Sequence, residues 1–284
     1  MKNSAVILVS CPDQKGVVAT LSDFVFRHNG NILHADEHAD EGSNLFLMRV
    51  EFDPSEFDLN LADFAKHFSP IAAKFEMNWR LAHSAYRPKM VILVSKYDHC
   101  LVDLLYRHKS GEFACDIPLI ISNHPDNQPI ADFYRIPYVT VPVPKDNKRP
   151  AEEKILALLK QHGPDFIVLA RYMQILSNEF VNEYPHRIIN IHHSFLPAFV
   201  GARPYHQAFT RGVKLIGATS HYVTEVLDDG PIIEQDVVRI SHRDSLDDLL
   251  QKGRDLEKVV LSRAVRWHIE NRILLYGNKT VVFD

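Results

Sequence analysis

The 284-residue chain has room for about two domains, and its composition, 46% hydrophobic and 24% charged, is that of a globular protein able to bury a core. A formal net charge of -4 argues against a nucleic-acid-binding surface, and no apolar run is long enough to span a bilayer. The three cysteines are far apart and form no C-x-x-C pair, so we expect a reducing cytoplasm and neither a disulfide framework nor a metal site.

Residues 1–83 follow the pattern strand, helix, strand, strand, helix, strand. The apolar run AVILVS stops at Cys11-Pro12-Asp13, and we interpret it as a buried strand rather than a cleaved leader. VVATLSDFVFRH then has helical spacing and ends at Asn29-Gly30. Two strand-like segments, a second helical segment and a last alternating strand complete the domain.

Residues 84–89 are expected to be a linker, and residues 90–284 a second domain in which strands and helices alternate. This alternation predicts a doubly wound, mostly parallel sheet, with ligands beyond the carboxyl ends of the strands. LARYMQIL and INIHHS lie at two such ends. A long helix is predicted from about Leu246 to Asn271, and a terminal hairpin that turns at Gly277-Asn278.

An amide, an imidazole and a carboxylate are the candidate catalytic groups. Asn190 and His192 alternate at the end of the apolar run RIINI, so on a strand both side chains point to one face. Asp228 stands just before the turn Asp229-Gly230-Pro231. Such groups suit a reaction that builds charge on a carbonyl oxygen: Asn190 as oxyanion donor, His192 as donor or general acid, and Asp228 as its partner and holder of an ordered water. Taken singly, Asn190 is more typical of a turn or cap, His192 of a surface or core histidine with its hydrogen bonds made, and Asp228 of a turn.

The spacing of these residues resembles the folate-dependent formyltransferase family, whose pattern is Asn-x-His followed by His-x-x-x-x-x-x-Asp near a glycine. The pattern falls on Asn190, His192, His221 and Asp228, and the resemblance covers residues from about 88 to the C-terminus. It implies a Rossmann-like formyltransferase domain that binds 10-formyltetrahydrofolate and needs no other cofactor. We expect His221 either to line the site or to support Asp228, and His193 to face away from it.

LARYMQIL resembles the family loop that cradles the pterin ring. The contacts implied are Met173, Gln174, Ile175 and Leu176, whereas the alternative is a routine apolar cap between a strand and a helix. The family often has glycine where Arg171 stands, so the loop is expected to differ here. Pro197 and Phe199 are expected to form another wall of the substrate site, or only to pack.

The same groups serve transferases and hydrolases, and the acceptor site should separate them. Transferases that act on a phosphorylated glycinamide carry a glycine-rich loop after their first strand, where this chain has the glycine-free ILVSKYDHCLVDLL. The stretch from His192 to Val223 also resembles the family's hydrolytic branch. The expected reaction is hydrolysis to tetrahydrofolate and formate, which supplies formate and balances one-carbon pools for purine synthesis. Transfer of the formyl group to an amine is the alternative reaction. The alternative to an enzyme is a non-catalytic regulator that binds folate or an amino acid.

The first domain, especially CPDQKGVVATLSDFVFRHNGNI, resembles the ACT regulatory domain, which has a ferredoxin-like α+β fold. The resemblance implies a homo-oligomer and an amino-acid effector such as glycine or methionine, bound near Asp13 and Gly16 at the first strand-to-helix turn. A purely structural role in oligomerisation is the open alternative. No nucleic-acid or membrane partner is expected.

Overall fold

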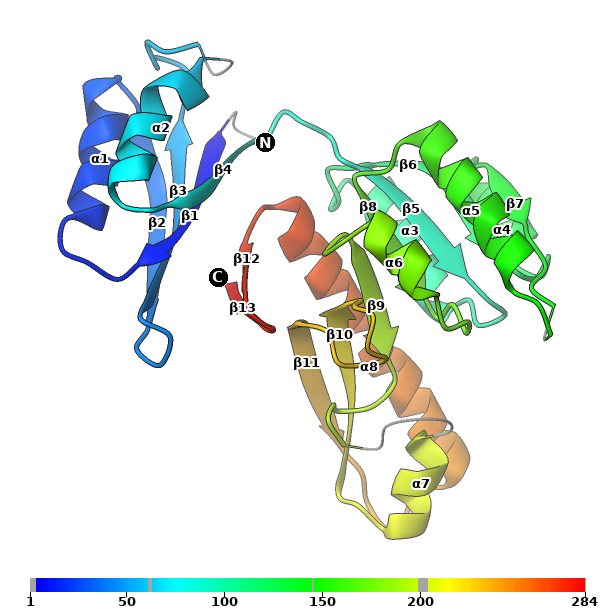
Figure 1. Ribbon diagram of the computed structural model, residues 1–284. Coiled ribbons are helices and arrows are strands. Elements are labelled where there is room, and N and C mark those ends of the chain that lie inside the picture. The colour runs from blue at the N-terminus through cyan, green and yellow to red at the C-terminus, as the bar shows by residue number, and fades with distance from the viewer. Residues whose placement is uncertain (1–3, 61–62, 145, 199–203, 284) are drawn as a thin grey trace. The chain divides into compact units, whose positions relative to one another are not determined.

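The computed structural model describes residues 4–60, 63–144, 146–198 and 204–283, and the chain divides into two compact units (Figure 1). One unit contains the residues up to Arg87 together with those from Glu270 onward, and the other runs from Pro88 to Ile269. The prediction of a second domain that continues to residue 284 is therefore wrong at its C-terminal end. Phe199, expected as a wall of the substrate site, lies outside the described residues.

The first unit is built on an antiparallel sheet in the predicted order of elements. These are β1 (Ala5–Pro12), α1 (Val17–Arg27), β2 (Asn31–Asp40), β3 (Leu45–Asp53), α2 (Phe64–Lys74) and β4 (Asn78–His83). The strands lie in the order β2-β3-β1-β4, so the first strand is central and pairs with both β3 and β4. The C-terminal part adds the hairpin β12 (Ile273–Tyr276) and β13 (Lys279–Val282).

Both faces of this sheet are covered, which explains why β1 is apolar at nearly every position. Ile7 and Val9 face the core under α1 and α2, the two helices on one side of the sheet (Figure 1). Val6 and Leu8 point to the other face, where they pack with Phe283 and hairpin residues. The hairpin thus belongs to the first unit because its apolar side chains complete the second core of that sheet.

The second unit alternates strands and helices as predicted. Its elements are β5 (Lys89–Val94), α3 (His99–Lys109), β6 (Asp116–Ser122), α4 (Gln128–Tyr134), β7 (Tyr138–Thr140), α5 (Arg149–His162), β8 (Phe166–Ala170), α6 (Asn178–Glu183), β9 (Ile188–His192), α7 (Pro204–Arg211), β10 (Leu215–Tyr222), β11 (Ile232–Arg239) and α8 (Leu246–Ile269). One bound differs from expectation: α8 ends at Ile269, before Asn271 adopts a left-handed backbone with φ 55°.

The sheet has the order β11-β10-β9-β8-β5-β6-β7. Its pairs from β9 to β7 are parallel, while β10 runs antiparallel to both β9 and β11. The prediction of a mostly parallel sheet is confirmed. The chain builds outward from β5 in one direction through β6 and β7, then returns to place β8 and β9 on the other side. This change of direction between β5 and β8 is where open sheets form a crevice for ligands.

Helices cover both faces of this second sheet. On one face α5 and α6 contribute Ile155, Leu159 and Phe180 to a core with the strands. On the other face α8 packs against β9, β10 and β11 and also contacts α3 and α7. Within the described part of the chain, no helix combines the length and the apolar character that crossing a bilayer requires.

We predict that Phe283→Ala destabilises the first unit by about 3 kcal/mol. The Phe283 side chain is 5% exposed in the core shared with the hairpin, so its removal leaves a cavity there. The chain has two tryptophans, so a Trp267→Phe background leaves Trp79 as the fluorescent reporter of the first unit during urea unfolding. Phe26→Ala, at a side chain 77% exposed, is the control and should change stability by less than about 0.5 kcal/mol. Equal midpoints for the two variants would show that the C-terminal segment contributes nothing to this core.

Candidate active site

A cavity of about 560 Å³ opens in the second unit. Its walls come from the segments that follow β5, β8 and β9, from the loop after β10, and from α7 and α8. It therefore lies beyond the carboxyl ends of the parallel strands, at the crevice that the strand order creates. The predicted residues that line it are Met173, Gln174, Ile175, Leu176, Asn190, His192, His221 and Asp228.

Asn190 and His192 lie at the carboxyl end of β9, on the same face of the strand. Ile189 and Ile191, which alternate with them, are buried, while Asn190 is half-buried and His192 is 6% exposed. The antiparallel neighbour β10 places His221 opposite Asn190 and Thr219 opposite His192. The sequence-based prediction that these two side chains reach one pocket holds, because the strand keeps its period of two up to His192.

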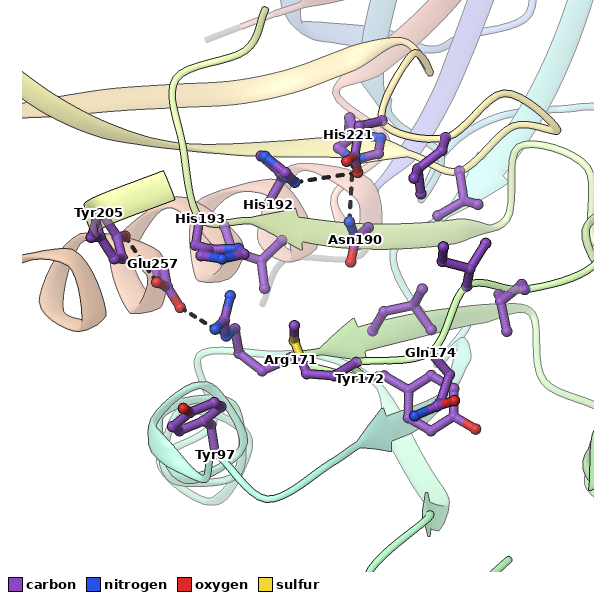
Figure 2. Close-up of a pocket in the computed structure, with 18 of the residues that line it drawn as sticks. Tyr97, Arg171, Tyr172, Gln174, Asn190, His192, His193, Tyr205, His221 and Glu257 are labelled. Carbon is purple, nitrogen blue, oxygen red and sulfur yellow. Dashed lines mark hydrogen bonds and ion pairs between the residues drawn. The ribbon is translucent and has the colours of Figure 1, made fainter. Parts of the chain in front are cut away.

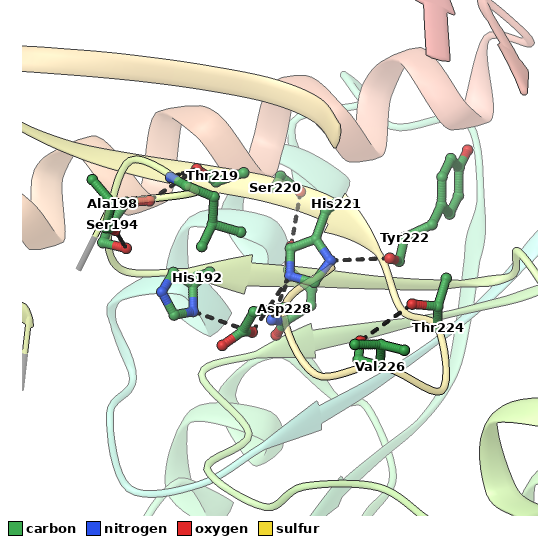
Figure 3. Close-up of polar contacts among 12 residues, drawn as sticks. His192, Ser194, Ala198, Thr219, Ser220, His221, Tyr222, Thr224, Val226 and Asp228 are labelled. Atoms are coloured by element: carbon green, nitrogen blue, oxygen red, sulfur yellow. Dashed lines mark hydrogen bonds and ion pairs between the residues drawn. The ribbon is translucent and has the colours of Figure 1, made fainter. Parts of the chain in front are cut away.

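Asp228 reaches the pair from the loop between β10 and β11. Its Oδ1 lies 3.2 Å from His192 Nδ1 and 3.8 Å from His221 Nε2 (Figure 3). The loop is fixed by Gly230, where any Cβ would overlap the carbonyl oxygen of Tyr222, and Asp228 itself has a left-handed backbone with φ 56°. Burial would raise the pKa of Asp228, but the hydrogen bond from His192 and the histidines around it outweigh burial and lower that pKa below 3.8.

His221 orients the amide of Asn190. Its Nδ1 lies 3.0 Å from the Tyr222 carbonyl oxygen, which only accepts, so this nitrogen carries the proton. Burial lowers the pKa of His221, which favours the neutral ring. Nε2 then has a free lone pair and accepts a hydrogen bond from the Asn190 Nδ2 amide at 3.2 Å. One amide hydrogen is thereby used, and the second remains as the donor that the predicted oxyanion role requires.

One ring nitrogen of His192 contacts Asp228, and the other makes no hydrogen bond to any described residue. The carboxylate of Asp228 only accepts, so Nδ1 donates to it. Nε2 is buried and has no hydrogen-bond partner among the described residues. A histidine in this state can take a proton on Nε2, and the imidazolium that results is stabilised by the adjacent carboxylate.

The segment after β8 presents apolar side chains to the cavity. Met173 is 50% exposed and Ile175 is 60% exposed, and both belong to the predicted pterin loop. Val226 and Leu227, which sequence reasoning missed, are also exposed and line the cavity from the loop that carries Asp228. Exposed apolar side chains on two walls suit a flat aromatic ligand.

Two predictions about the segment after β9 need correction. His193 was expected to face away from the site, but it lines the cavity, because β9 ends at His192 and the alternation stops there. Pro197 is exposed and is not among the residues that line the cavity. Its segment is held instead against β10, where Thr219 Oγ1 accepts a hydrogen bond from the Leu196 amide at 3.0 Å.

A second polar cluster, which the sequence did not reveal, lines the cavity around Glu257. This carboxylate is 1% exposed and contacts His99 Nε2 at 2.8 Å, the Tyr205 hydroxyl at 2.9 Å and Arg171 Nε at 3.3 Å. Burial would raise the pKa of Glu257, but His99 and Arg171 outweigh it and lower that pKa. The sequence feature that could have indicated this cluster is one acidic residue on the otherwise mainly apolar buried face of α8, between Gly253 and Val260.

His99, Cys100 and Glu257 offer ligand atoms within 4.8 Å of one another. Arg171 already places a guanidinium against the same oxygen of Glu257 that His99 contacts. A metal cation there would be repelled by the guanidinium, so these residues suit a buried ion-pair network better than a metal centre.

The residues expected to bind an effector lie in the first unit. Asp13 is exposed, and its amide donates to the Asn44 carbonyl at 3.0 Å. Gly16 precedes α1 with φ 95°, a conformation that L-residues rarely adopt, and a Cβ there would meet no atom within 4 Å. The turn therefore needs glycine for its backbone, and the space beside it is open.

The sequence profile described as formyl transferase matches residues 88–265. The chain is 55% identical to the formyltetrahydrofolate deformylase of Synechocystis sp. over 99% of its own length and 98% of that protein, and 46% identical to that of Bacillus subtilis over 98% and 93%. A crystal structure of a formyltetrahydrofolate deformylase from Pseudomonas syringae is similar at a TM-score of 0.98, with 51% identity, covering 100% of this chain and 95% of that one. The phosphoribosylglycinamide formyltransferase of Anaplasma phagocytophilum is similar at a TM-score of 0.64, with 32% identity, over 70% of this chain and 96% of that one.

We predict that His193 makes the protein less stable as the pH falls. Burial, and then the nearby Arg171 guanidinium, lower the pKa of His193 from 6.5 to about 3. The unfolded chain takes up a proton at His193 below pH 6.5 while the folded protein does not until about pH 3, so folding is opposed increasingly across that window.

In urea titrations between pH 7 and pH 4, His193→Gln should lose stability less steeply than the wild type, by at most about 1.4 kcal/mol per pH unit. His206→Gln, at an exposed histidine of α7, is the matched control and should follow the wild type. Parallel curves for the wild type and His193→Gln would contradict the lowered pKa.

Proposed function

Because the chain belongs to the formyltetrahydrofolate deformylase family, within the formyl transferases, we propose that it hydrolyses 10-formyltetrahydrofolate to tetrahydrofolate and formate. The observation that carries this proposal is the convergence of Asn190, His192 and Asp228 on one wall of the cavity, with His192 and Asp228 in contact at 3.2 Å. These side chains supply an oxyanion donor, a proton carrier and its counter-charge, so the reaction needs no cofactor beyond the folate itself.

The formyl group on the folate nitrogen is an activated amide, and water attacks its carbon. The attack turns the carbonyl oxygen into an oxyanion, to which Asn190 donates the amide hydrogen that His221 leaves unused. A preorganised donor of this kind contributes about 3–4 kcal/mol to the stability of such a transition state.

Collapse of the intermediate breaks the carbon–nitrogen bond. His192 holds the proton that the attacking water gives up and passes it to the departing folate nitrogen, and formic acid then loses its own proton to solvent. Asp228, whose pKa lies below 3.8, stays ionised and stabilises the imidazolium during this transfer. The carboxylate also offers a second oxygen on which an ordered water can be held.

The apolar walls suggest how the folate is oriented. Met173 and Ile175 on one side, with Val226 and Leu227 on the other, offer contacts to its flat rings. Gln174 and the backbone of the same loop offer hydrogen-bonding groups to the edge of the heterocycle. The pterin would thus lie toward residues 173–176, with the formyl group at Asn190 and His192.

We further propose that the formate released feeds one-carbon metabolism and balances folate pools for purine synthesis, in the cytoplasm. Three buried cysteines that form no disulfide are compatible with a reducing compartment. Transfer of the formyl group to an amine is the competing function, since phosphoribosylglycinamide formyltransferases share the fold of the second unit. A binding regulator without catalysis is disfavoured by the intact contact between His192 and Asp228 and by the hydrogen bond that orients Asn190.

The first unit is proposed to be an ACT-like domain that senses an amino acid and mediates homo-oligomerisation. Its β1-α1-β2-β3-α2-β4 order and the strand order β2-β3-β1-β4 agree with a ferredoxin-like fold. The open space beside Gly16 and the exposed Asp13 support an effector site at the start of α1.

We predict that the purified protein releases formate and tetrahydrofolate in equal amounts from 10-formyltetrahydrofolate with no acceptor added. Asp228→Asn should reduce turnover by about 10³-fold, because it removes the counter-charge of His192, and Asn190→Ala by about 10²-fold, because it removes the oxyanion donor. Product would be quantified by chromatography.

Asp229→Asn is the matched control, since it makes the same change at the adjacent exposed aspartate and should keep wild-type turnover. Near-normal turnover in Asp228→Asn would remove Asp228 from the mechanism. Formation of product only after an amine is added would establish the transferase instead.

We predict that glycine or methionine changes the rate of formate release and binds with measurable heat in calorimetry. Asp13→Asn should weaken this binding about tenfold, because it removes a charged partner for the amino group. Glu56→Gln, at another exposed acid of the first unit, is the control. Absence of both binding and rate change for the two amino acids would leave the unit with a structural role.

A further inference from the structure

The cavity has two sides, separated by the catalytic groups. Gln174 of the proposed pterin loop lies on one side of Asn190, and Arg171, Glu257 and Tyr205 gather on the other (Figure 2). If the folate occupies the first side, as the proposed function requires, then a nucleophile that attacks the formyl carbon must approach from the second. The residues of that second side therefore determine which nucleophile can react.

Arg171 follows β8 directly, and His192 ends β9, the neighbouring strand of the sheet. The Arg171 guanidinium points toward His193, the residue after His192 (Figure 2). Arg171 and His192 both line the cavity, and both are buried. The guanidinium fills space in this part of the cavity wall that a smaller residue would leave open.

The backbone at Arg171 would suit glycine better than arginine. Its φ is 61°, in the left-handed region that favours glycine. A glycine here would adopt this conformation without strain and would remove the entire side chain from the cavity. The arginine is held in place by its charged group rather than by a favourable backbone.

Two contacts hold this side chain. Arg171 Nε forms an ion pair with Glu257 at 3.3 Å but makes no hydrogen bond to any described residue, and the guanidinium carbon lies 5.3 Å from the centre of the Tyr97 ring. Glu257 is in turn fixed by His99 and by Tyr205, whose ring packs so tightly on Gly253 that a Cβ there would overlap it. The arginine is therefore a rigid part of the wall.

We propose that Arg171, positioned by Glu257, is the residue that makes water the formyl acceptor, because it fills the space that an amine acceptor would need. With water, an O–C bond forms, the C–N bond of the folate breaks, and the folate nitrogen gains a proton. With an amine, an N–C bond forms in place of the O–C bond, and the amine proton replaces the water proton. Both reactions use Asn190, His192 and Asp228 in the same way, so only the space beside them separates the two outcomes.

The test measures the partition between the two acceptors, with glycinamide as a small amine probe. Wild type, Arg171→Gly and Arg171→Gly/Glu257→Gln are incubated with 10-formyltetrahydrofolate and glycinamide, and formate and formylglycinamide are quantified by mass spectrometry. The double variant avoids leaving Glu257 ionised without Arg171, and thermal unfolding shows which variants are folded. Arg254→Ala is the matched control, since it removes another guanidinium, 5.9 Å from the Tyr97 ring, from an exposed position.

We expect the ratio of formylglycinamide to formate to rise at least tenfold in Arg171→Gly or in the double variant, while Arg254→Ala keeps the wild-type ratio. A ratio within twofold of wild type in both folded variants overturns the inference, as does loss of both products from both, which would place Arg171 in the reaction itself. These outcomes leave the proposed function intact if the wild type releases formate. Absence of formate from the wild type overturns the proposed function, and the inference with it.

Discussion

The contact between His192 and Asp228 is the interaction on which the rest of the site depends. It joins the end of β9 to the loop after β10, and neither residue could do its proposed work alone. The loop reaches His192 only because Gly230 passes against the Tyr222 carbonyl. The same carbonyl fixes the tautomer of His221, and His221 fixes the amide of Asn190. One backbone group thus orients two of the three catalytic side chains.

Electrostatics explains how three histidines can surround one carboxylate without competing for it. Burial lowers the pKa values of His193 and His221, so both stay neutral near neutral pH. The charge that Asp228 can stabilise is then left to His192, which alone among them donates a close hydrogen bond to it at 3.2 Å. His192 is also the ring whose other nitrogen, Nε2, is buried with no hydrogen-bond partner among the described residues.

The sequence predicted what depends on local pattern and missed what depends on tertiary packing. The period of a strand was enough to bring Asn190 and His192 to one face, and alternating elements were enough to predict a mostly parallel sheet. His193 was misplaced because the strand ends one residue earlier than the pattern suggests. The C-terminal hairpin was assigned to the wrong domain because its apolar residues find their partners in β1 and β3, far away in sequence.

The sequence did not predict the cluster around Glu257, because burying these charged groups is not expected to stabilise the fold. Burying a carboxylate and a guanidinium costs solvation that their attraction only partly returns, so apolar residues of similar volume would often be at least as stable. The left-handed backbone of Arg171 adds strain of about 1 kcal/mol or more. A cluster that is costly in both ways is better explained by the shape and charge it gives the cavity than by the stability of the fold. That distinguishes it from the apolar residues on the same helix, whose burial stabilises the packing of α8 against the sheet.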